Sequence, residues 1–266
     1  MNRIDSTFKN LKAKRQKAAI AFVTAGDPSL KITREALRFA QKTGMDLVEL
    51  GVPFSDPLAD GPVIQASSFR ALGRGTNLSQ ILGLVRDERR NGLSIPVLLM
   101  TSFNPVNHFG VRKALVEAKR AGVDGFIIPD LPYHEAGDVL REAKRLDLRL
   151  ILMITPTTDA ARRRELLKRA NGFLYYVSLT GVTGERKRAS YPFKGDVLRI
   201  RRSSRVPLCV GFGISTPAQA RAISRFADGV IVGSAIVRDL AEHSRSGLSN
   251  ASRRRISGFV RAVKGD

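Results

Sequence analysis

Residues 207–234 read PLCVGFGISTPAQARAISRFADGVIVGS. Two short apolar runs, at 207–211 and 229–234, flank a segment in which Ser215-Thr216-Pro217 is typical of a helix start. Both runs are continuously apolar rather than alternating, which is typical of strands buried on both faces in a parallel sheet. The stretch therefore predicts a strand, a helix and a second strand in succession.

The same alternation continues through the rest of the chain. Six further apolar runs precede this stretch, at 19–24, 46–52, 96–102, 125–129, 148–155 and 173–178. Amphipathic segments that predict helices lie between them, among them 31–43, 111–121 and 134–146. Eight strand and helix units in this length predict an α/β fold, the (β/α)8 TIM barrel, with a doubly wound open sheet as the alternative.

Two regions depart from the regular spacing. The interval 53–90 is long enough for a loop rich in proline, aspartate and glycine and for more than one helix. Before residue 18, Ile4, Phe8 and Leu11 share one face of an extra N-terminal helix, which we expect to cover the bottom of the barrel. No linker or change in composition divides the chain, so we expect one domain, residues 1–266.

Composition excludes several classes of protein. The chain has 266 residues and a single cysteine, Cys209, which excludes an internal disulfide framework and a multi-cysteine zinc site. The three histidines are far apart in the sequence, so we expect no metal site. No apolar run approaches the ~18 residues of a membrane-spanning helix, and the charged N-terminus lacks the apolar region of a signal peptide, so we expect a cytoplasmic protein without membrane attachment.

The net charge of +21 is the unusual quantity. It is compatible with nucleic acid, an anionic substrate or an acidic partner. The basic clusters are spread over several expected helices, and few aromatic residues stand among them to stack on bases. We therefore expect a solvated basic surface and regard nucleic-acid binding as the disfavoured alternative.

Glu49 is the first candidate for catalysis, because it is a carboxylate inside an otherwise apolar strand. In a barrel of this kind the active site lies at the carboxyl ends of the strands. Burial would raise the pKa of Glu49 toward neutrality, which suits a general acid or base. The alternative is that Glu49 forms a structural ion pair with a basic residue.

Glycines at the ends of the last two strands predict an anion site. Gly211 and Gly213 follow the seventh strand, and Gly233 and Ser234 follow the eighth. A helix that begins at Ser234 would direct its positive end toward the same place, where barrels usually bind phosphate. The alternative is that these glycines only form tight turns. The polar loop after the sixth strand, 178–188, is either a lid over a ligand or a basic connection.

Taken together, these motifs resemble the tryptophan synthase alpha subunit family along essentially the whole chain. The most specific is 47–62, LVELGVPFSDPLADGP. Supporting motifs are FVTAGDP at 22–28, IIPDLP at 127–132, GVTG at 181–184, GFGI at 211–214 and VGSA at 232–235.

The resemblance implies a retro-aldol cleavage of indole-3-glycerol phosphate to indole and glyceraldehyde 3-phosphate. Glu49 matches the principal acid/base of the family, which would protonate indole C3 and accept the glycerol hydroxyl proton. Asp60 matches the carboxylate that accepts a hydrogen bond from the indole N–H. No metal or organic cofactor is implied on this chain.

The resemblance also implies the rest of the substrate site. Phosphate binding falls to the backbone at Gly184, Gly213, Gly233 and Ser234. The pocket lining is expected to include Phe22, Ile64, Met100, Ile127, Met153 and Phe212, with Tyr175 beside Glu49 and Thr183 closing toward Asp60. The alternative for Tyr175 is an ordinary half-buried tyrosine of the strand. Independently of the resemblance, we expect Asp130, at the end of the fourth strand, to order the active-site loops; the alternative is that it satisfies a local backbone turn.

A partner is implied as well. In this family the loop after the second strand contacts a beta subunit that carries pyridoxal phosphate, in an alpha2-beta2 heterotetramer. Pro53, Phe54, Asp56 and Pro57 are the candidate contacts, although Asp56 is also suited to capping its own loop. Ser102 stands where the family more usually has tyrosine, and 185–188 is more basic than expected. A free-standing lyase with the same chemistry is the alternative.

Overall fold

The structure is a computed structural model, and it describes residues 1–57, 60–178, 191–244 and 247–265. Eight parallel strands form a closed barrel in sequence order, and β1 pairs with both β2 and β8. The (β/α)8 prediction is confirmed and the open sheet is excluded. The strands are β1 (Ala18–Thr24), β2 (Leu47–Gly51), β3 (Val97–Met100), β4 (Gly125–Ile127), β5 (Arg149–Ile154), β6 (Leu174–Val177), β7 (Leu208–Gly211) and β8 (Gly229–Val232).

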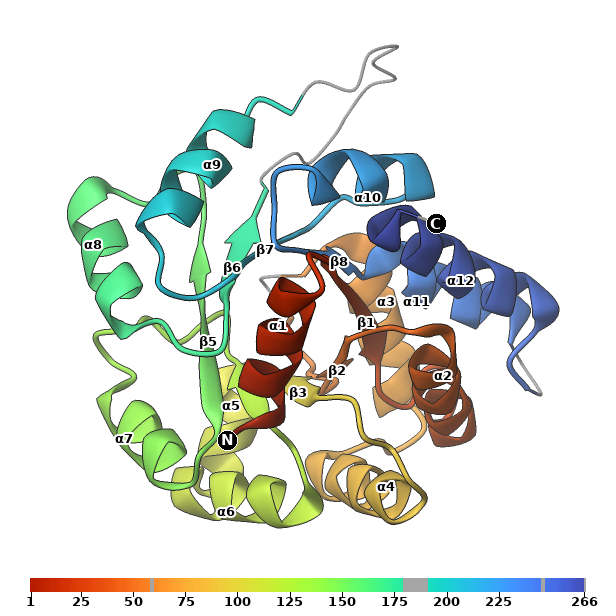
Figure 1. Cartoon of the computed structure of the whole chain (residues 1–266). Helices are drawn as coiled ribbons and strands as arrows, with labels where there is room; N and C mark the ends of the chain where they lie inside the picture. The colour runs from red at the N-terminus through yellow and green to blue at the C-terminus, as the bar shows by residue number, and fades with distance from the viewer. Residues whose placement is uncertain (58–59, 179–190, 245–246, 266) are drawn as a thin grey trace.

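Helices surround the barrel on its outside (Figure 1). As expected, the interval after β2 holds two of them. The helices are α1 (Arg3–Ala13), α2 (Leu30–Thr43), α3 (Pro62–Leu72), α4 (Leu78–Arg90), α5 (Phe103–Phe109), α6 (Val111–Ala121), α7 (Gly137–Arg145), α8 (Ala160–Arg169), α9 (Lys194–Ser203), α10 (Pro217–Ser224), α11 (Ser234–His243) and α12 (Asn250–Lys264).

The ends of the helices follow local chemistry. Thr216 caps α10 in a reciprocal arrangement with Gln219, and Gly44 ends α2 in the left-handed conformation with φ 88°. The helix expected at 134–146 begins later, at Gly137. The backbone N–H groups of Glu135 and Ala136 both donate to the carbonyl of Pro132, so these residues form a turn instead.

Strand residues alternate between the barrel interior and the helix layer. Val48 and Leu50 pack in the cluster between strands and helices, whereas Leu47 packs in the cluster that fills the barrel. Because successive side chains of a strand point to opposite faces, Glu49 points into the barrel with Leu47. Cys209 lies in the same interior cluster and is completely buried, as expected.

The extra N-terminal helix, α1, closes the end of the barrel at which the strands begin (Figure 1). Ile4, Phe8 and Leu11 are buried, and the Phe8 ring lies 5.6 Å from that of Phe173, just before β6. The side chain of Asn2 donates to the carbonyls of Asp124 and Asp147 at 2.9 and 2.8 Å, which attaches the helix to the starts of β4 and β5. The prediction that this helix covers the bottom is confirmed.

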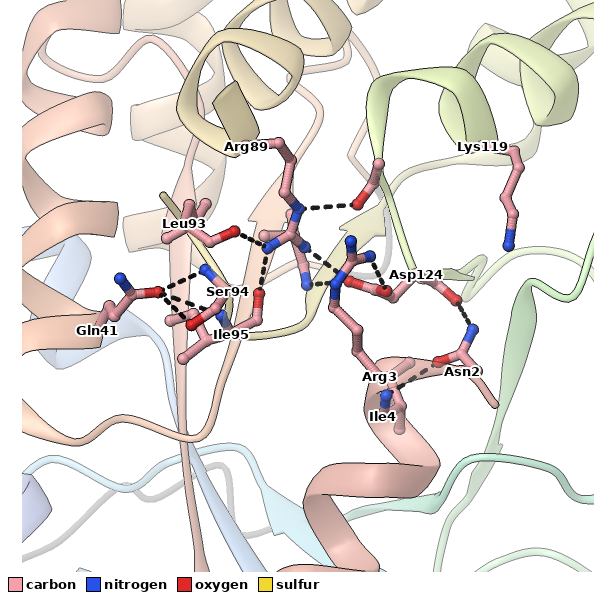
Figure 2. Close-up of polar contacts among 12 residues, drawn as sticks. Asn2, Arg3, Ile4, Gln41, Arg89, Leu93, Ser94, Ile95, Lys119 and Asp124 are labelled. Carbon is pink, nitrogen blue, oxygen red and sulfur yellow. Dashed lines mark hydrogen bonds and ion pairs between the residues drawn. The ribbon is translucent and has the colours of Figure 1, made fainter. Parts of the chain in front are cut away.

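A buried aspartate joins α1 to α4 at this end. Figure 2 shows Arg3 and Arg89 donating to Asp124, at 2.9 and 2.7 Å, while the N–H of Val97 donates to it at 2.9 Å. Arg89 also donates to the carbonyls of Leu93 and Ile95. Burial lowers the pKa of Arg89 to about 10. This network fixes the starts of two strands, at the end of the barrel where stability rather than catalysis is usually decided.

None of the helices among the described residues is both long enough and apolar enough to cross a membrane. None of the histidine, cysteine, aspartate and glutamate side chains in this part of the chain forms a group of three or more that could hold a metal ion.

Candidate functional site

Two adjoining hollows open at the carboxyl ends of the strands. The larger has a volume of about 300 Å³ and the smaller about 60 Å³, and Phe22, Asp60, Ile64 and Met100 line both. The larger extends under the β2–α3 loop, past Gly51 and Phe54. The smaller reaches the ends of β7 and β8. Together they form one elongated site with a carboxylate, Asp60, where the two halves meet.

Glu49 lies in the middle of β2, one inward-facing position before Gly51, and lines neither hollow itself. It is completely buried, and neither carboxylate oxygen has a hydrogen-bond partner among the described residues. Gly51, the next inward-facing position along β2, lines the larger hollow. Burial raises the pKa of Glu49 to about 8. The structural ion pair considered from the sequence is therefore not formed within the described part of the chain.

Asp60 precedes α3 and is only partly buried. Its backbone is fixed on both sides, because its N–H donates to the carbonyl of Pro57 at 3.0 Å and its own carbonyl accepts from Gln65 Nε2 at 2.9 Å. Burial raises the pKa of Asp60 to about 6. At neutral pH the deeper carboxyl, Glu49, is thus mostly protonated, while Asp60 is mostly ionised.

Two glycines at strand ends make room for the aromatic walls of the site. A Cβ added at Gly51 would lie 2.5 Å from Cζ of Phe22, and one added at Gly211 would lie 2.3 Å from the hydroxyl oxygen of Tyr175. Burial, together with the charges of Glu49 and Asp60, raises the pKa of Tyr175 well above its usual value. Tyr175 is therefore a neutral phenol, and negative charge on either carboxyl further disfavours its ionisation.

The far end of the smaller hollow is built from backbone. It is lined by Gly213, Gly233 and Ser234, and α11 begins at Ser234 as expected. The N–H groups of a first helical turn have no partner within the helix, and the helix dipole is positive there, so this end suits an anion. Phe212 and Gly213 both have positive φ, 83° and 73°, and Ser178 donates to the carbonyl of Phe212 at 3.1 Å.

The structure brings most of the predicted residues together. Phe22, Ile64, Met100, Tyr175 and Phe212 line the hollows, and so do Phe54, Asp56 and Pro57. Pro53 is buried behind them. Ile127 and Met153 pack in the barrel interior and line neither hollow. Thr183 and Gly184 lie outside the described residues.

Several residues of the site escaped the sequence reasoning. Thr24 and Ser68 line the larger hollow, and the Thr24 hydroxyl lies 2.6 Å from that of Ser67. Nearby, the guanidinium of Arg70 binds both carboxylate oxygens of Asp27 at 2.8 Å, which ties α3 to the β1–α2 loop. These pairs are 43 residues apart in the sequence, so only the folded barrel shows them.

Two further expectations concern loops. The Asp130 carboxylate accepts the N–H of Phe103 at 2.8 Å and thereby connects the β4–α7 loop to the start of α5, which confirms its ordering role. Ser102 lines the larger hollow beside Asn104 and leaves room where a tyrosine would fill it.

Comparison with known proteins gives a consistent result. The model of the tryptophan synthase alpha chain family matches residues 8–262. The tryptophan synthase alpha chain of Geotalea daltonii is 47% identical over 264 residues, which cover 99% of this chain and 98% of that protein. The corresponding protein of Pelobacter propionicus is 42% identical over 265 residues, covering 100% of this chain and 99% of its own length.

Solved structures agree. Tryptophan synthase subunit alpha from Legionella pneumophila superposes with a TM-score of 0.92 at 39% identity, with 100% of both chains covered. A chain of Mycobacterium tuberculosis tryptophan synthase superposes with a TM-score of 0.88 at 30% identity, with 99% of both chains covered.

Proposed function

The chain belongs to the tryptophan synthase alpha chain family, and we propose that Glu49 and Asp60 carry that family's reaction in this barrel. The reaction is the cleavage of indole-3-glycerol phosphate to indole and glyceraldehyde 3-phosphate, so the chain is a carbon–carbon lyase. The observation that carries the assignment of residues is Glu49, a completely buried carboxyl without a hydrogen-bond partner among the described residues, one inward-facing strand position before Gly51, which lines the larger hollow.

The first step needs a proton donor at neutral pH. With its pKa raised to about 8, Glu49 holds a proton that it gives to C3 of the indole ring, and the ring becomes an iminium-like cation. Asp60, whose pKa is about 6, is ionised and accepts a hydrogen bond from the indole N–H, which stabilises this cation. The different environments thus keep Glu49 protonated, as the acid, and Asp60 ionised, as the anion.

The second step returns the proton to the same residue. The Glu49 carboxylate accepts the proton of the hydroxyl next to the ring, the bond from C3 to the glycerol chain breaks, and its electron pair neutralises the ring. Indole and an aldehyde result, and Glu49 is protonated again. Glu49 thus gives one proton to indole C3 and takes one from the hydroxyl, so it ends the reaction in its starting state, and no cofactor takes part.

The phosphate of the substrate fits the end of the smaller hollow. We assign it to the backbone N–H groups at Gly213, Gly233 and Ser234, with Gly184 as a further member outside the described residues. The indole then lies between Phe22, Ile64 and Met100, in reach of Asp60. Ile127 and Met153 pack in the barrel interior and support this pocket, and we assign closure toward Asp60 to Thr183, which lies outside the described residues.

The β2–α3 loop is the proposed contact with a beta subunit. Phe54 and the exposed Asp56 line the larger hollow, so a partner bound to this loop would lie next to the place where indole is released. We propose that Pro53, Phe54, Asp56 and Pro57 contact that subunit in an alpha2-beta2 heterotetramer, with pyridoxal phosphate held by the partner.

The test is release of indole from indole-3-glycerol phosphate, with and without a cognate beta subunit. Glu49→Gln should lower the rate by at least the ~10²–10⁴-fold that general acid–base catalysis supplies. Asp60→Asn should lower kcat, and Glu135→Gln, a change at an exposed carboxyl, should have no effect. Equal activity of Glu49→Gln and the unchanged protein would refute the mechanism. A rate unaffected by the beta subunit would favour a free-standing lyase.

A further inference from the structure

A third hollow lies at the other end of the barrel and is much larger. Its volume is about 700 Å³, and it lies between α1 and the connection from α9 to β7. Figure 1 shows α1 across this end of the barrel. Six of the lining residues are basic and two are acidic; the basic ones are Lys9, Lys12, Arg15, Lys17, Arg201 and Arg205.

Both acids of this basic groove are already engaged. Asp5 binds the guanidinium of Arg149, with its Oδ2 at 2.5 Å from Nη2. Asp228 accepts Arg201 Nε at 2.7 Å and the N–H of Leu208 at 3.1 Å, and Lys17 lies 3.7 Å away. Asp5 is thus paired with Arg149 outside the groove, and Asp228 with Arg201 and Lys17 within it. Neither carboxylate neutralises the other basic residues.

Four of the basic residues remain unpaired. Lys9, Lys12, Arg15 and Arg205 are exposed, and within the described residues their side chains make no ion pair, hydrogen bond or cation–π contact. Lys9 and Lys12 project from α1, whereas Arg205 comes from the opposite wall. Like charges that converge on one hollow repel each other, and an anion between them would remove that repulsion.

Capping of the C-terminal end of α1 does not explain these basic residues. Its last carbonyls already have donors, because the N–H of Gln16 donates to Leu11 at 2.9 Å and the N–H of Arg15 donates to Lys12 at 3.1 Å. Arg15 also has a φ of 55°, a left-handed conformation that glycine adopts at less cost at a helix end. The backbone N–H of Arg15 caps the helix as that of a glycine would, so helix capping does not account for the arginine side chain.

We propose that the basic groove binds a compact polyphosphate, either inorganic or esterified to a nucleoside. The hollow has the size of a small-ligand site. Guanidinium groups match phosphate oxygens in pairs, and the ammonium groups add point charges. A nucleic acid fits less well, because unpaired bases need aromatic surfaces, and the one aromatic residue of the groove, Phe8, is 6% exposed.

The test is calorimetric titration of the full chain with tripolyphosphate, ATP, AMP and a decameric oligouridylate at fixed ionic strength. We expect saturable one-to-one binding of tripolyphosphate and ATP, with AMP at least about tenfold weaker. Equal affinities for tripolyphosphate and ATP would assign recognition to the phosphate chain alone. A tighter ATP complex would place the nucleoside on the apolar wall at Val206 and Pro207.

A matched pair of variants locates the site. Lys12→Gln/Arg205→Gln removes two charges from the groove, and Arg162→Gln/Arg164→Gln removes two exposed charges from α8. The first pair should weaken tripolyphosphate binding at least about tenfold, and the second less than about twofold. Within the described part of the chain, none of these four side chains forms a hydrogen bond, ion pair or cation–π contact, so thermal unfolding should stay unchanged in both variants.

Three outcomes would overturn the proposal. The first is equal weakening by the two variant pairs, which would mean that diffuse surface charge binds the anion. The second is the absence of saturable binding of tripolyphosphate and ATP. The third is binding of the oligouridylate alone. The groove is remote from the catalytic end, so Glu49→Gln should retain polyphosphate binding and Lys12→Gln/Arg205→Gln should retain indole release.

Discussion

Replacing Glu49 by glutamine should stabilise the fold at neutral pH while it abolishes catalysis. The carboxyl is completely buried and has no hydrogen-bond partner among the described residues. Its pKa rises from an ordinary 4.5 to about 8 because burial disfavours the charged form. Glutamine has nearly the same shape and no charge, so it removes the ionisation without creating a cavity.

The size of the effect follows from the two pKa values. Below pH 4.5 Glu49 is protonated in both the folded and the unfolded chain, and its ionisation costs nothing. Between pH 4.5 and 8 only the unfolded chain ionises, so stability falls by about 1.4 kcal/mol per pH unit. At pH 7 the accumulated loss is about 3 kcal/mol, and above pH 8 it stops growing. Glu49→Gln should recover most of this loss.

Urea unfolding at pH 5, 6 and 7 measures the prediction. The free energy of unfolding of Glu49→Gln should exceed that of the unchanged protein by an amount that grows with pH and nearly vanishes toward pH 4.5. Glu135→Gln, at an exposed carboxyl, should show no such growth. A difference that stays constant across the three pH values would refute the reasoning, because it would mean that Glu49 titrates alike in the folded and unfolded chains.

Four further predictions concern activity and stability. The pH profile of kcat/KM should be bell-shaped, rising through about 6 as Asp60 ionises and falling through about 8 as Glu49 loses its proton; Asp60→Asn should lower the rate and remove the acid limb. Asp124→Asn should destabilise the fold by about 3 kcal/mol in urea unfolding, because it breaks a buried ion pair, whereas Arg3→Ala, at a half-exposed side chain, should cost less than about 1 kcal/mol. Gly211→Ala should displace Tyr175 and lower kcat/KM, while Gly137→Ala, with nothing within 4 Å of the added Cβ, should leave it unchanged; equal activities would show that the Tyr175 position is immaterial. Ser102→Tyr should fill part of the larger hollow and lower kcat/KM for substrates with a substituted indole ring more than for the unsubstituted one.

The architecture could be predicted from sequence because burial in a parallel sheet leaves a plain pattern. The run at 207–211 is continuously apolar, the run at 46–52 is apolar apart from Asp46 and Glu49, and each contains the strand that forms there. Helix ends were equally visible where capping is local, as at Thr216. The start of α7 could not be predicted, because the residues after Pro132 have helical periodicity but form a turn.

Several residues that line the two hollows could be predicted from the sequence, but which interior side chains reach the hollows could not. Strand alternation places Ile127 and Met153 inside the barrel with Met100, yet only the stagger of the closed barrel decides which of the three reaches the hollow. The pair of Asp27 and Arg70 joins residues far apart in sequence, and neither has a local pattern that marks it. Such contacts exist only once the loops at the carboxyl ends have been brought together.

The distribution of positive charge connects these observations. The chain has 45 lysines and arginines, yet none of them is among the described residues that line the two catalytic hollows. A cation there would stabilise both carboxylates and lower their pKa values, so Glu49 would no longer hold a proton at neutral pH. The mechanism therefore requires anion binding by backbone N–H groups at α11 rather than by basic side chains. Among the described residues, a group of basic side chains lies instead at the bottom of the barrel, where the basic groove can use them without disturbing the acid.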